Sequence, residues 1–369
     1  MVCIPVKTAS ASYEAVIELG LLARSGEILR ELLGGTPPLF LVTVSPVRRR
    51  WGKPLLRSLK SAGFTPQLIE MRDGERFKRL STVESLSEKL LRLGADRKAV
   101  IVAFGGGVVG DVGGMLASVY MRGVKLVQIP TTVQAQLDAA IGGKTGVNLR
   151  AGKNLVGTFY QPQIVLIDPA TLATLPAREF RAGMYEALKA GVIGNPKLFS
   201  RLETSSIETL RKDKDKDKEF LTWVLAESVR LKAQVVSADE KEGDLRRVLN
   251  FGHTIGHALE AATAYRTFLH GEAVAWGMIA ATKISAEIGL CDHAVYDRIV
   301  AATRGWGSLP KVTVQIAKAL KLMQSDKKTE AGSIHFVLPR EIGRVEIVKN
   351  VPEPAIAAAL AEIRRLSRG

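Results

Sequence analysis

Three of the five histidines of this chain fall within 18 residues: His253, His257 and His270. His253 and His257 are four residues apart in GHTIGHALE, so on a helix they share one face. A single histidine is usually a satisfied core or surface residue, whereas clustered neutral imidazoles favour a zinc site. Spacing alone therefore predicts that His253 and His257 are both ligands. The third ligand is then His270 or an acid from elsewhere, with Glu186 as a candidate.

Glu186 lies in the helical pattern MYEALKAG, and Lys189 follows three residues later. Such a pair is most simply an ion pair on the surface of a helix. The flanking residues are small and apolar, however, which is typical of a packed helix rather than an exposed one. The pattern therefore indicates a buried carboxylate and a buried ammonium group.

A glycine-rich segment, GGGVVGDVGG, follows the apolar run KAVIVAF. Gly105, Gly107 and Gly110 match G-x-G-x-x-G between an expected strand and an expected helix, an arrangement that lets backbone N–H groups approach a phosphate. A tight turn without a ligand is the alternative. The common dinucleotide fingerprint is not matched, because the motif follows a later strand and the next strand ends in Pro130-Thr131-Thr132 without an acid. We predict phosphate binding.

The net charge of the chain is +15, from 52 Lys and Arg against 37 Asp and Glu. Such an excess is typical of a protein with an anionic partner, although a generally basic surface is the alternative. The chain has no long basic tail and no basic strand interleaved with aromatic residues, so we expect no nucleic-acid partner. Several basic residues instead stand in glycine-flanked or apolar surroundings, which favours a multiply anionic small molecule. Lys144 and Lys153 are flanked by glycine, and the other basic candidates are Arg122, Lys232, Arg246 and Lys328. Asn154 follows Lys153, and Asn250 lies four residues after Arg246.

The elements that must position these residues change in type near residue 175. Before it, continuous apolar runs alternate with helical patterns, which predicts an α/β domain whose parallel sheet is covered on both faces. Ser81 with Glu84 is a capping signal for a helix in this half. After residue 175 the pattern is mostly helical. We predict an α/β domain over 1–174 and a mostly α-helical domain over 175–369. The expected strands are 38–45, 65–71, 98–104, 124–130 and 162–168.

The length and composition of the chain limit the class of protein to which it can belong. A chain of 369 residues is long enough for two domains, and 46% apolar with 24% charged residues excludes disorder as the main state. No apolar run reaches the ~20 residues of a membrane helix, and the first residues do not resemble a secretory signal. Cys3 and Cys291 alone make no disulfide framework. We expect a cytoplasmic protein without a membrane partner.

Taken together, these segments resemble the 3-dehydroquinate synthase family of sugar phosphate cyclases. GGKTGVN and NFGHTIGHALE, with LHGEAV beyond them, are specific in combination. The similarity runs in family order from residue 73 to 328. The matching stretches are DGERFK, GGGVVGDVGG, YMRGV, IPTT, LDAAIGGKTGVN, KNLVGTFYQP, TLP, EFRAGMYEALK, LRRVLNFGHTIGHALE, LHGEAV and SDKK.

The resemblance implies that the α/β domain over 1–174 binds the dinucleotide NAD and that the α-helical domain over 175–369 binds the metal and the substrate. It also implies a role for each matching residue. Glu186, His253 and His270 correspond to zinc ligands, with cobalt as an alternative metal, and His257 to a group that acts on the substrate; this replaces the interpretation from spacing. Asp138 stands near the nicotinamide and the metal, and Arg122 corresponds to an arginine that reaches the phosphate from a neighbouring subunit. The substrate contacts implied are Lys144, Lys153, Asn154, Lys189, Lys232, Arg246, Asn250 and Lys328. The NAD contacts implied are Glu75, Lys78, Gly105, Gly106, Gly107, Asp111, Thr131, Thr132, Lys144, Lys153 and Thr174.

The sequence departs from the family pattern at two places. Val44 and Ser45 stand where the family usually has an acid that binds the adenine ribose, and Arg48, Arg49 and Arg50 follow. We predict that NAD is still preferred over NADP, but by a smaller margin. Tyr185 and Ala190 differ from the commonest neighbours of Glu186, where we expect changes in packing rather than in chemistry.

The family's reaction is the NAD-dependent but redox-neutral conversion of 3-deoxy-D-arabino-heptulosonate 7-phosphate, a sugar acid phosphate, to 3-dehydroquinate and phosphate, a lyase step of the shikimate pathway in aromatic amino acid biosynthesis. The resemblance implies this activity and a homodimer. Alternatives are a sister cyclase acting on another sugar phosphate, a metal-dependent polyol dehydrogenase, a basic nucleic-acid-binding protein and a non-catalytic nucleotide-binding subunit. The lysine set disfavours the dehydrogenase, and Arg246 with GGKTGVN favours a substrate that carries a carboxylate.

Overall fold

The structure, a computed structural model, describes residues 1–207, 214–327 and 334–368. The chain forms two compact units. The first comprises Met1–Leu175 with Lys218–Lys241, and the second comprises Pro176–Asp217 with Glu242–Gly369. No helix among the described residues has both the length and the apolar character needed to cross a membrane.

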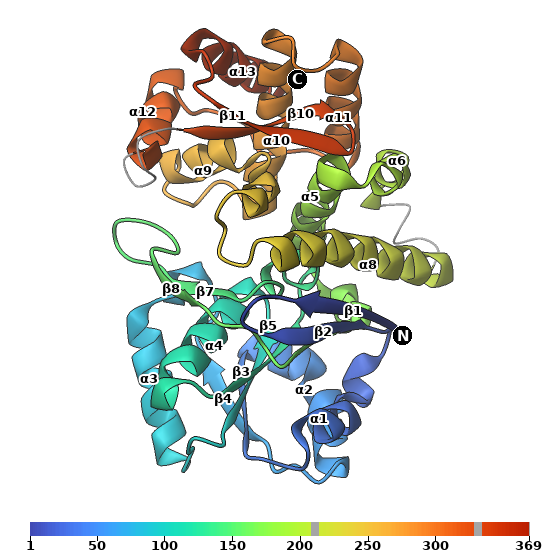
Figure 1. Ribbon diagram of the computed structural model, residues 1–369, viewed down its shortest axis with the longest axis vertical. Helices are drawn as coiled ribbons and strands as arrows, with labels where there is room; N and C mark the ends of the chain where they lie inside the picture. Colours follow the sequence, from blue (N-terminus) through green and yellow to red (C-terminus); the bar gives the residue numbers. More distant parts are fainter. Residues whose placement is uncertain (208–213, 328–333, 369) are drawn as a thin grey trace. The chain divides into compact units, whose positions relative to one another are not determined.

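The first unit contains a seven-stranded sheet in the order β1-β2-β9-β6-β5-β3-β4. Figure 1 labels β1 to β5 of this sheet. All neighbouring strands are parallel except β1 and β2, which form an antiparallel hairpin. The five predicted strands and the α/β class are confirmed. The hairpin was not predicted, because its strands alternate between exposed and buried residues rather than forming continuous apolar runs. The strands are β1 (Val2–Lys7), β2 (Ser12–Ile17), β3 (Leu39–Val44), β4 (Gln67–Met71), β5 (Val100–Gly105), β6 (Lys125–Pro130) and β9 (Ile164–Ile167).

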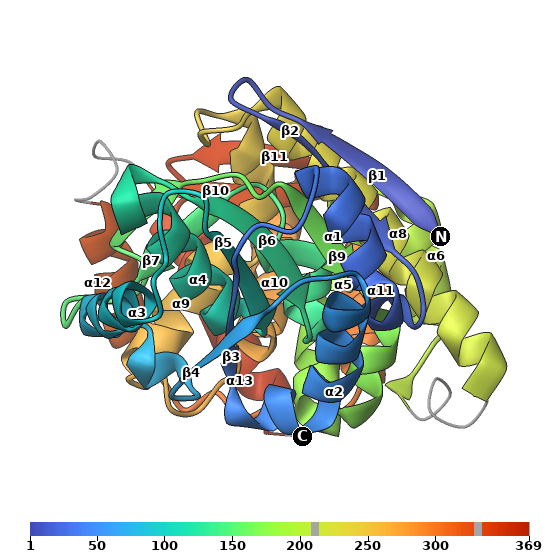
Figure 2. The same ribbon diagram turned by 90° about the horizontal axis from the view of Figure 1, so that it is seen from below.

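Helices cover both faces of the sheet, as the fully buried strands β3 and β5 require. Alternate residues of these strands join two separate apolar clusters. One cluster includes α3 (Leu80–Arg92) and α4 (Gly107–Val119), and the other includes α1 (Ser25–Leu33) and α2 (Ser45–Ser61). Figure 2 shows the two helix pairs on opposite sides of the strands. The sheet therefore holds its carboxyl ends rigidly between two packed layers.

The predicted capping role of Ser81 is wrong. Helix α3 begins at Leu80, its N-cap is Arg79, and no side chain caps it. Ser81 is already inside the first turn. The backbone instead turns through the short helix η2 (Glu75–Phe77), where the Thr82 hydroxyl donates a hydrogen bond to the Phe77 carbonyl oxygen at 2.6 Å.

The first unit is not continuous in sequence. It includes Lys218–Lys241, which contains most of helix α8 (Lys214–Ala238) and follows the predicted domain boundary at residue 175. Polar contacts explain this membership. Ser237 accepts a hydrogen bond from the Lys7 amide at 3.1 Å, and Glu240 accepts one from Gln161 at 2.9 Å. The assignment of NAD binding to one domain and metal binding to the other stays a prediction.

The second unit is mainly helical, and α10 packs against α5, α9, α11 and α13. Glycines permit its close contacts. A Cβ on Gly271 would lie 1.8 Å from the Ala182 carbonyl oxygen of α5, and one on Gly277 would lie 1.8 Å from the Gly252 oxygen. The helices of this unit are α5 (Ala177–Gly194), α6 (Pro196–Glu203), η6 (Leu245–Asn250), α9 (His253–Ala262), α10 (His270–Glu287), α11 (His293–Gly305), α12 (Ile316–Lys327) and α13 (Glu353–Leu366), with the hairpin β10 (His335–Glu341) and β11 (Arg344–Lys349).

Candidate functional site

The glycine segment of the first unit joins β5 to α4, as the motif predicted. Gly105 ends β5, Gly106 precedes the helix and Gly107 is its first residue. The Thr131 amide donates a hydrogen bond to the Gly105 oxygen at 2.9 Å, and a Cβ on Gly106 would lie 3.0 Å from Thr132 Cγ2. The five predicted residues are therefore adjacent at the carboxyl ends of β5 and β6. The first N–H groups of α4 make this place suitable for a phosphate.

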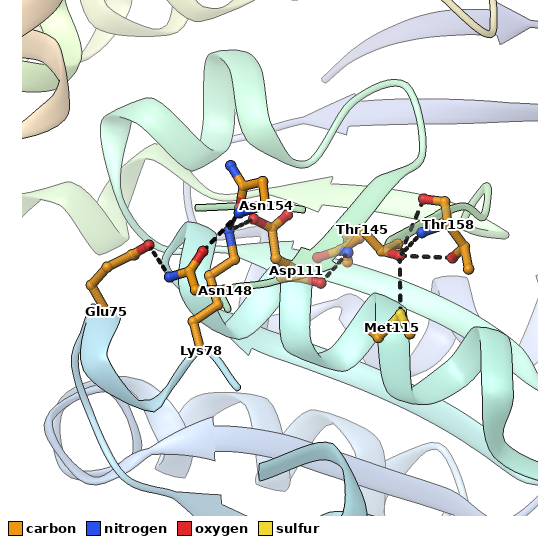
Figure 3. Close-up of polar contacts among 10 residues, drawn as sticks. Glu75, Lys78, Asp111, Met115, Thr145, Asn148, Asn154 and Thr158 are labelled. Carbon is orange, nitrogen blue, oxygen red and sulfur yellow. Dashed lines mark hydrogen bonds and ion pairs between the residues drawn. The ribbon is translucent and has the colours of Figure 1, made fainter. Parts of the chain in front are cut away.

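A polar cluster around the buried side chain of Lys78 lies beside this turn (Figure 3). The Lys78 ammonium group is hydrogen-bonded to the Asp111 carboxylate and to the Asn154 side chain. Burial raises the pKa of Asp111, and the Lys78 charge opposes that rise. Asn148, which was not predicted, accepts a hydrogen bond from the backbone N–H of Asn154 at 2.9 Å. Its side chain also donates a hydrogen bond to the Glu75 carboxylate at 2.8 Å. Its place in GGKTGVN was the only signal in the sequence.

Asp138 and Lys232 meet in the first unit although 94 residues separate them. Asp138 lies on a π-helical turn, η4 (Ala135–Ala139), and Lys232 lies on α8. Lys232 is 9% exposed, and its ammonium group donates hydrogen bonds to the carboxylate and to the backbone oxygen of Asp138. A π-helical turn often marks a functional position, because it turns one side chain out of the regular helical register.

The remaining predicted residues of the first unit are less enclosed. Lys144 is exposed on β7 (Lys144–Val147), which pairs with β8 (Val156–Phe159), and Lys153 is half-buried before β8. Thr174 ends the short helix η5 (Pro169–Thr174), where its hydroxyl accepts a hydrogen bond from Trp51 Nε1 at 2.9 Å. Arg122 is exposed and has a positive φ of 67° at the end of η3 (Tyr120–Arg122).

In the second unit the three clustered histidines converge. His253 and His257 lie on α9, and His270 is the first residue of α10. Their ring centroids are 5.2 to 5.7 Å apart, and one ligand atom from each lies within 4.8 Å of the others. The close crossing of α9 and α10 at glycine residues produces this approach.

Glu186 reaches the same cluster from α5. Its Oε1 lies 3.4 Å from His270 Nε2, and its Oε2 lies 2.6 Å from Lys189 Nζ. The side chains of Glu186 and Lys189 are 1% and 5% exposed, so the alternative of a surface ion pair is wrong. Oε1 is buried and receives no hydrogen bond from any residue that the structure describes. An oxygen in this condition fits a metal ligand.

The electrostatics of the histidines suit a cation. Burial, followed by the charges of Lys189, His270 and His257, holds the pKa of His253 well below its usual value, so its ring is neutral. His253 Nδ1 lies 3.2 Å from the Phe251 carbonyl oxygen, which leaves Nε2 for another partner. Burial alone lowers the pKa of His270, but its hydrogen bond to Glu260 and the Glu186 charge outweigh burial and raise it.

The donor set of this cluster fits zinc or cobalt, because imidazole nitrogens and a carboxylate oxygen are ligands that both metals accept. The geometry brings all four side chains together. It admits His253 and His257, the pair that spacing predicted, with His270 as the third ligand. It also admits the set of Glu186, His253 and His270 that the resemblance implied. The choice between the two sets stays a prediction.

Two further predicted residues, Arg246 and Asn250, lie on η6 of the second unit. Arg246 is 1% exposed, and Asn250 Nδ2 donates a hydrogen bond to Glu242 Oε1 at 3.3 Å. Lys328 lies outside the described residues.

Sequence reasoning missed the groups that hold the histidine helices in place. The Arg178 guanidinium on α5 makes two hydrogen bonds of 2.7 Å to the Glu272 carboxylate on α10. Glu272 Oε2 also accepts the backbone N–H of Leu269 at 2.9 Å, which caps α10 immediately before His270. Glu272 lies in the LHGEAV segment, but nothing in its spacing pointed to Arg178.

Comparison with known proteins settles the family. A family model described as 3-dehydroquinate synthase N-terminal matches residues 68–182, and a model described as 3-dehydroquinate synthase C-terminal matches residues 183–329. The chain belongs to the 3-dehydroquinate synthase family. It is 50% identical over 364 residues to the 3-dehydroquinate synthase of Koribacter versatilis (strain Ellin345), covering 99% of this chain and 98% of that protein.

Solved structures agree with this family. The 2-epi-5-epi-valiolone synthase of Streptomyces hygroscopicus subsp. jinggangensis 5008, with NAD⁺ and Zn²⁺ bound, matches with a TM-score of 0.87 and 31% identity over 96% of this chain and 98% of that chain. A 2-deoxy-scyllo-inosose synthase complexed with carbaglucose-6-phosphate, NAD⁺ and Co²⁺ matches with a TM-score of 0.84 and 25% identity over 98% of this chain and 99% of that chain. Relatives with this fold therefore bind NAD⁺ with a divalent metal.

Proposed function

We propose that this chain is a 3-dehydroquinate synthase that converts 3-deoxy-D-arabino-heptulosonate 7-phosphate to 3-dehydroquinate and phosphate. The observation that carries the proposal is the convergence of Glu186, Lys189 and three histidines in a protein of this family. A cytoplasmic location is part of the proposal.

NAD, when bound, supplies a hydride acceptor that returns the hydride, and zinc supplies Lewis-acid stabilisation of substrate hydroxyl oxygens. In the second unit, Glu186, His253 and His270 hold the metal, with His253 kept neutral by its buried position. His257, exposed at the open side of the cluster, moves a proton to or from the substrate. Lys189, Arg246 and Asn250 bind its anionic and hydroxyl groups.

In the first unit, the turn from β5 to α4 binds the pyrophosphate of NAD through its backbone N–H groups. The Lys78–Asp111 ion pair lies beside this turn and holds it in place. The other contacts to the cofactor come from Glu75, Thr131, Thr132 and Thr174. Lys232 holds Asp138 in a single orientation towards the nicotinamide. Lys144, Lys153 and Asn154 bind substrate oxygens, with Lys144 and Lys153 also contacting the cofactor.

Cofactor choice follows from the residues after β3. Val44 precedes α2 and Ser45 is its first residue, so no carboxylate stands there to repel a 2′-phosphate. Arg48 forms an ion pair with Glu70 of β4, so it is less available to bind the 2′-phosphate of NADP. We infer that NAD is preferred by a modest margin. Binding titrations with NAD⁺ and NADP⁺ test this inference, and tighter binding of NADP⁺ would contradict it.

We also propose a homodimer in which Arg122 acts on the substrate of the neighbouring subunit. Val119, Met121 and Phe159, which are 39–44% exposed, lie on the mutually packed elements α4, η3 and β8 near Arg122, as expected of an apolar contact surface. Mixing inactive Arg122→Ala and His257→Ala proteins tests this arrangement. Activity should return in the hybrid dimer, because one of its two sites then has both residues intact. A monomeric mass in light scattering would contradict the proposal.

The activity itself is tested by incubating the protein with the sugar acid phosphate, a divalent metal and substoichiometric NAD⁺. Phosphate and dehydroquinate should form together over many turnovers without accumulation of NADH. NADH that grows in step with product would instead indicate a dehydrogenase. Turnover of a heptulose 7-phosphate or glucose 6-phosphate alone would indicate a sister cyclase.

A further inference from the structure

Glu260 is a buried carboxylate to which no role has yet been given. It is 2% exposed on α9 and lies seven residues after His253 and three after His257, so the three side chains share one face of the helix. An ionised group is removed from water at a considerable cost unless a partner compensates. The identity of its partner therefore indicates its role.

One such partner is His270. Glu260 Oε2 lies 3.1 Å from His270 Nδ1, and on the other side of the same ring Nε2 lies 3.4 Å from Glu186 Oε1. A carboxylate can only accept a hydrogen bond, so Nδ1 must carry the proton that is donated to Glu260. The lone pair of Nε2 is then directed towards Glu186 and the other histidines.

His253 shows the same arrangement with a weaker acceptor. Its Nδ1 lies 3.2 Å from the backbone oxygen of Phe251. Two rings on different helices are thus each held at Nδ1. Outer partners of this kind fix the tautomer and the orientation of a metal-binding histidine. The Phe251 carbonyl is part of the backbone, whereas Glu260 is a side chain that a single substitution removes.

We propose that Glu260 is a positioning residue of the metal site, which holds His270 by its Nδ1 so that Nε2 binds the metal. The proposal rests on the proposed metal site. It requires His270 to be a ligand, as it is in the set of three histidines and in the set of Glu186, His253 and His270.

The test compares the zinc affinity of the wild type with that of Glu260→Gln, which keeps the size of the side chain but offers an amide in place of the carboxylate. Zinc binding, measured by competition with a chromophoric chelator, should weaken roughly 10–100-fold. The visible absorption bands of the cobalt-loaded protein should shift, because the orientation of one ligand changes. Glu341→Gln, at an exposed carboxylate on β10, is the matched control and should leave both readouts unchanged.

A purely structural role would give a different result. Glu260→Gln would then lower the melting temperature of the apo-protein but leave the zinc dissociation constant within twofold and the cobalt spectrum unchanged, and this outcome would overturn the proposal. If the wild type itself binds no zinc, the proposed metal site is wrong. This result differs from an unchanged zinc affinity in Glu260→Gln, which would overturn only the role of Glu260.

A second measurement observes the tautomer of His270 directly in the wild-type protein. In zinc-loaded wild-type protein labelled with ¹⁵N at histidine, the resonances of the His270 ring should show a protonated Nδ1 and a metal-bound Nε2. His270→Gln identifies those resonances by their loss. A metal-bound Nδ1 at His270 would overturn the proposal.

Discussion

At the scale of single residues, the first question is which histidine binds metal and which acts on the substrate. His257 follows His253 by one turn, about 6 Å along the helix axis, and is the most exposed of the three. His257→Ala should keep its zinc and lose roughly 10²–10⁴ in turnover, since that is the usual contribution of a positioned acid–base group. His253→Ala and His270→Ala should lose zinc on dialysis.

Metal analysis of the dialysed variants decides between the two ligand sets. A zinc-free His257→Ala protein together with a zinc-retaining Glu186→Gln protein would establish the three histidines as the ligands. In that case the geometry of the clustered rings, and not the family correspondence, would describe the site.

Tyr185 allows a second test at this scale. Its side chain is 0% exposed, and its hydroxyl has no hydrogen-bond partner among the described residues, while burial raises its pKa far above the usual value. A buried donor without a partner is destabilising, so Tyr185→Phe should raise the free energy of unfolding by about 1 kcal/mol. Tyr296→Phe is the control and should lower it, because the Tyr296 hydroxyl donates to Glu362 at 2.8 Å. Urea unfolding measures both, and a loss of stability in Tyr185→Phe would point to a bound water.

At the scale of elements, the contact between α5 and α10 brings His270 to Glu186. Gly271 makes this contact possible, because a Cβ there would lie 1.8 Å from the Ala182 oxygen. Gly271→Ala should therefore force the helices apart, lower the free energy of unfolding by about 3 kcal/mol and weaken zinc binding. Gly305→Ala, at the end of α11 where a Cβ meets no atom within 4 Å, should be neutral or slightly stabilising. Equal effects of the two variants would contradict the steric argument.

The link between α11 and α13 should depend on pH. Glu362 accepts hydrogen bonds from Arg365 at 2.7 and 2.8 Å and from Tyr296 at 2.8 Å, and these bonds lower its pKa to about 2. The ordinary value is near 4.3, so the carboxylate stabilises the folded state above about pH 5, and this stabilisation is lost as pH falls towards 2. Because Arg365 is exposed, the contribution is about 1–2 kcal/mol.

Unfolding of Glu362→Gln at several pH values measures this contribution. The variant should be less stable than the wild type at pH 7, and the difference should shrink between pH 5 and pH 3. A difference that does not vary with pH would show that the lost interaction is not that of the ionised carboxylate.

The sequence predicted those elements whose pattern is local. The predicted strands β3, β5 and β9 are short, largely apolar runs that are buried along their whole length. The helix that carries His253 and His257 shows its own spacing. Contacts between distant segments were beyond such reasoning. Lys232 joins Asp138 across 94 residues, and Arg178 joins Glu272 across the same separation. Glu260 in GHALEAA was missed because a buried glutamate in a helix has no distinct spacing until its partner His270 is placed against it.

At the scale of the whole molecule, the net charge of +15 should influence how the anionic substrate arrives. Between about 0.01 and 0.1 M salt, the screening length falls from ~30 to ~10 Å. If the summed charge of the protein attracts the substrate, kcat/KM should fall by roughly 3–10-fold over this range, while kcat changes much less. Salt screens the charges that contact the substrate directly far less than it screens distant charges. The salt dependence of kcat/KM therefore measures mainly the effect of charges far from the substrate.

Helix α2 carries exposed charges that have no role in the proposed site. Lys53, Arg57 and Lys60 are exposed on it. Changing all three to Gln removes one charge at each position and lowers the net charge from +15 to +12, and changing them to Glu lowers it to +9. The salt dependence of kcat/KM should weaken in that order, with kcat and thermal stability unchanged. Identical salt dependence in all three proteins would show that only the residues at the binding site attract the substrate, and that the excess of basic residues has no part in its capture.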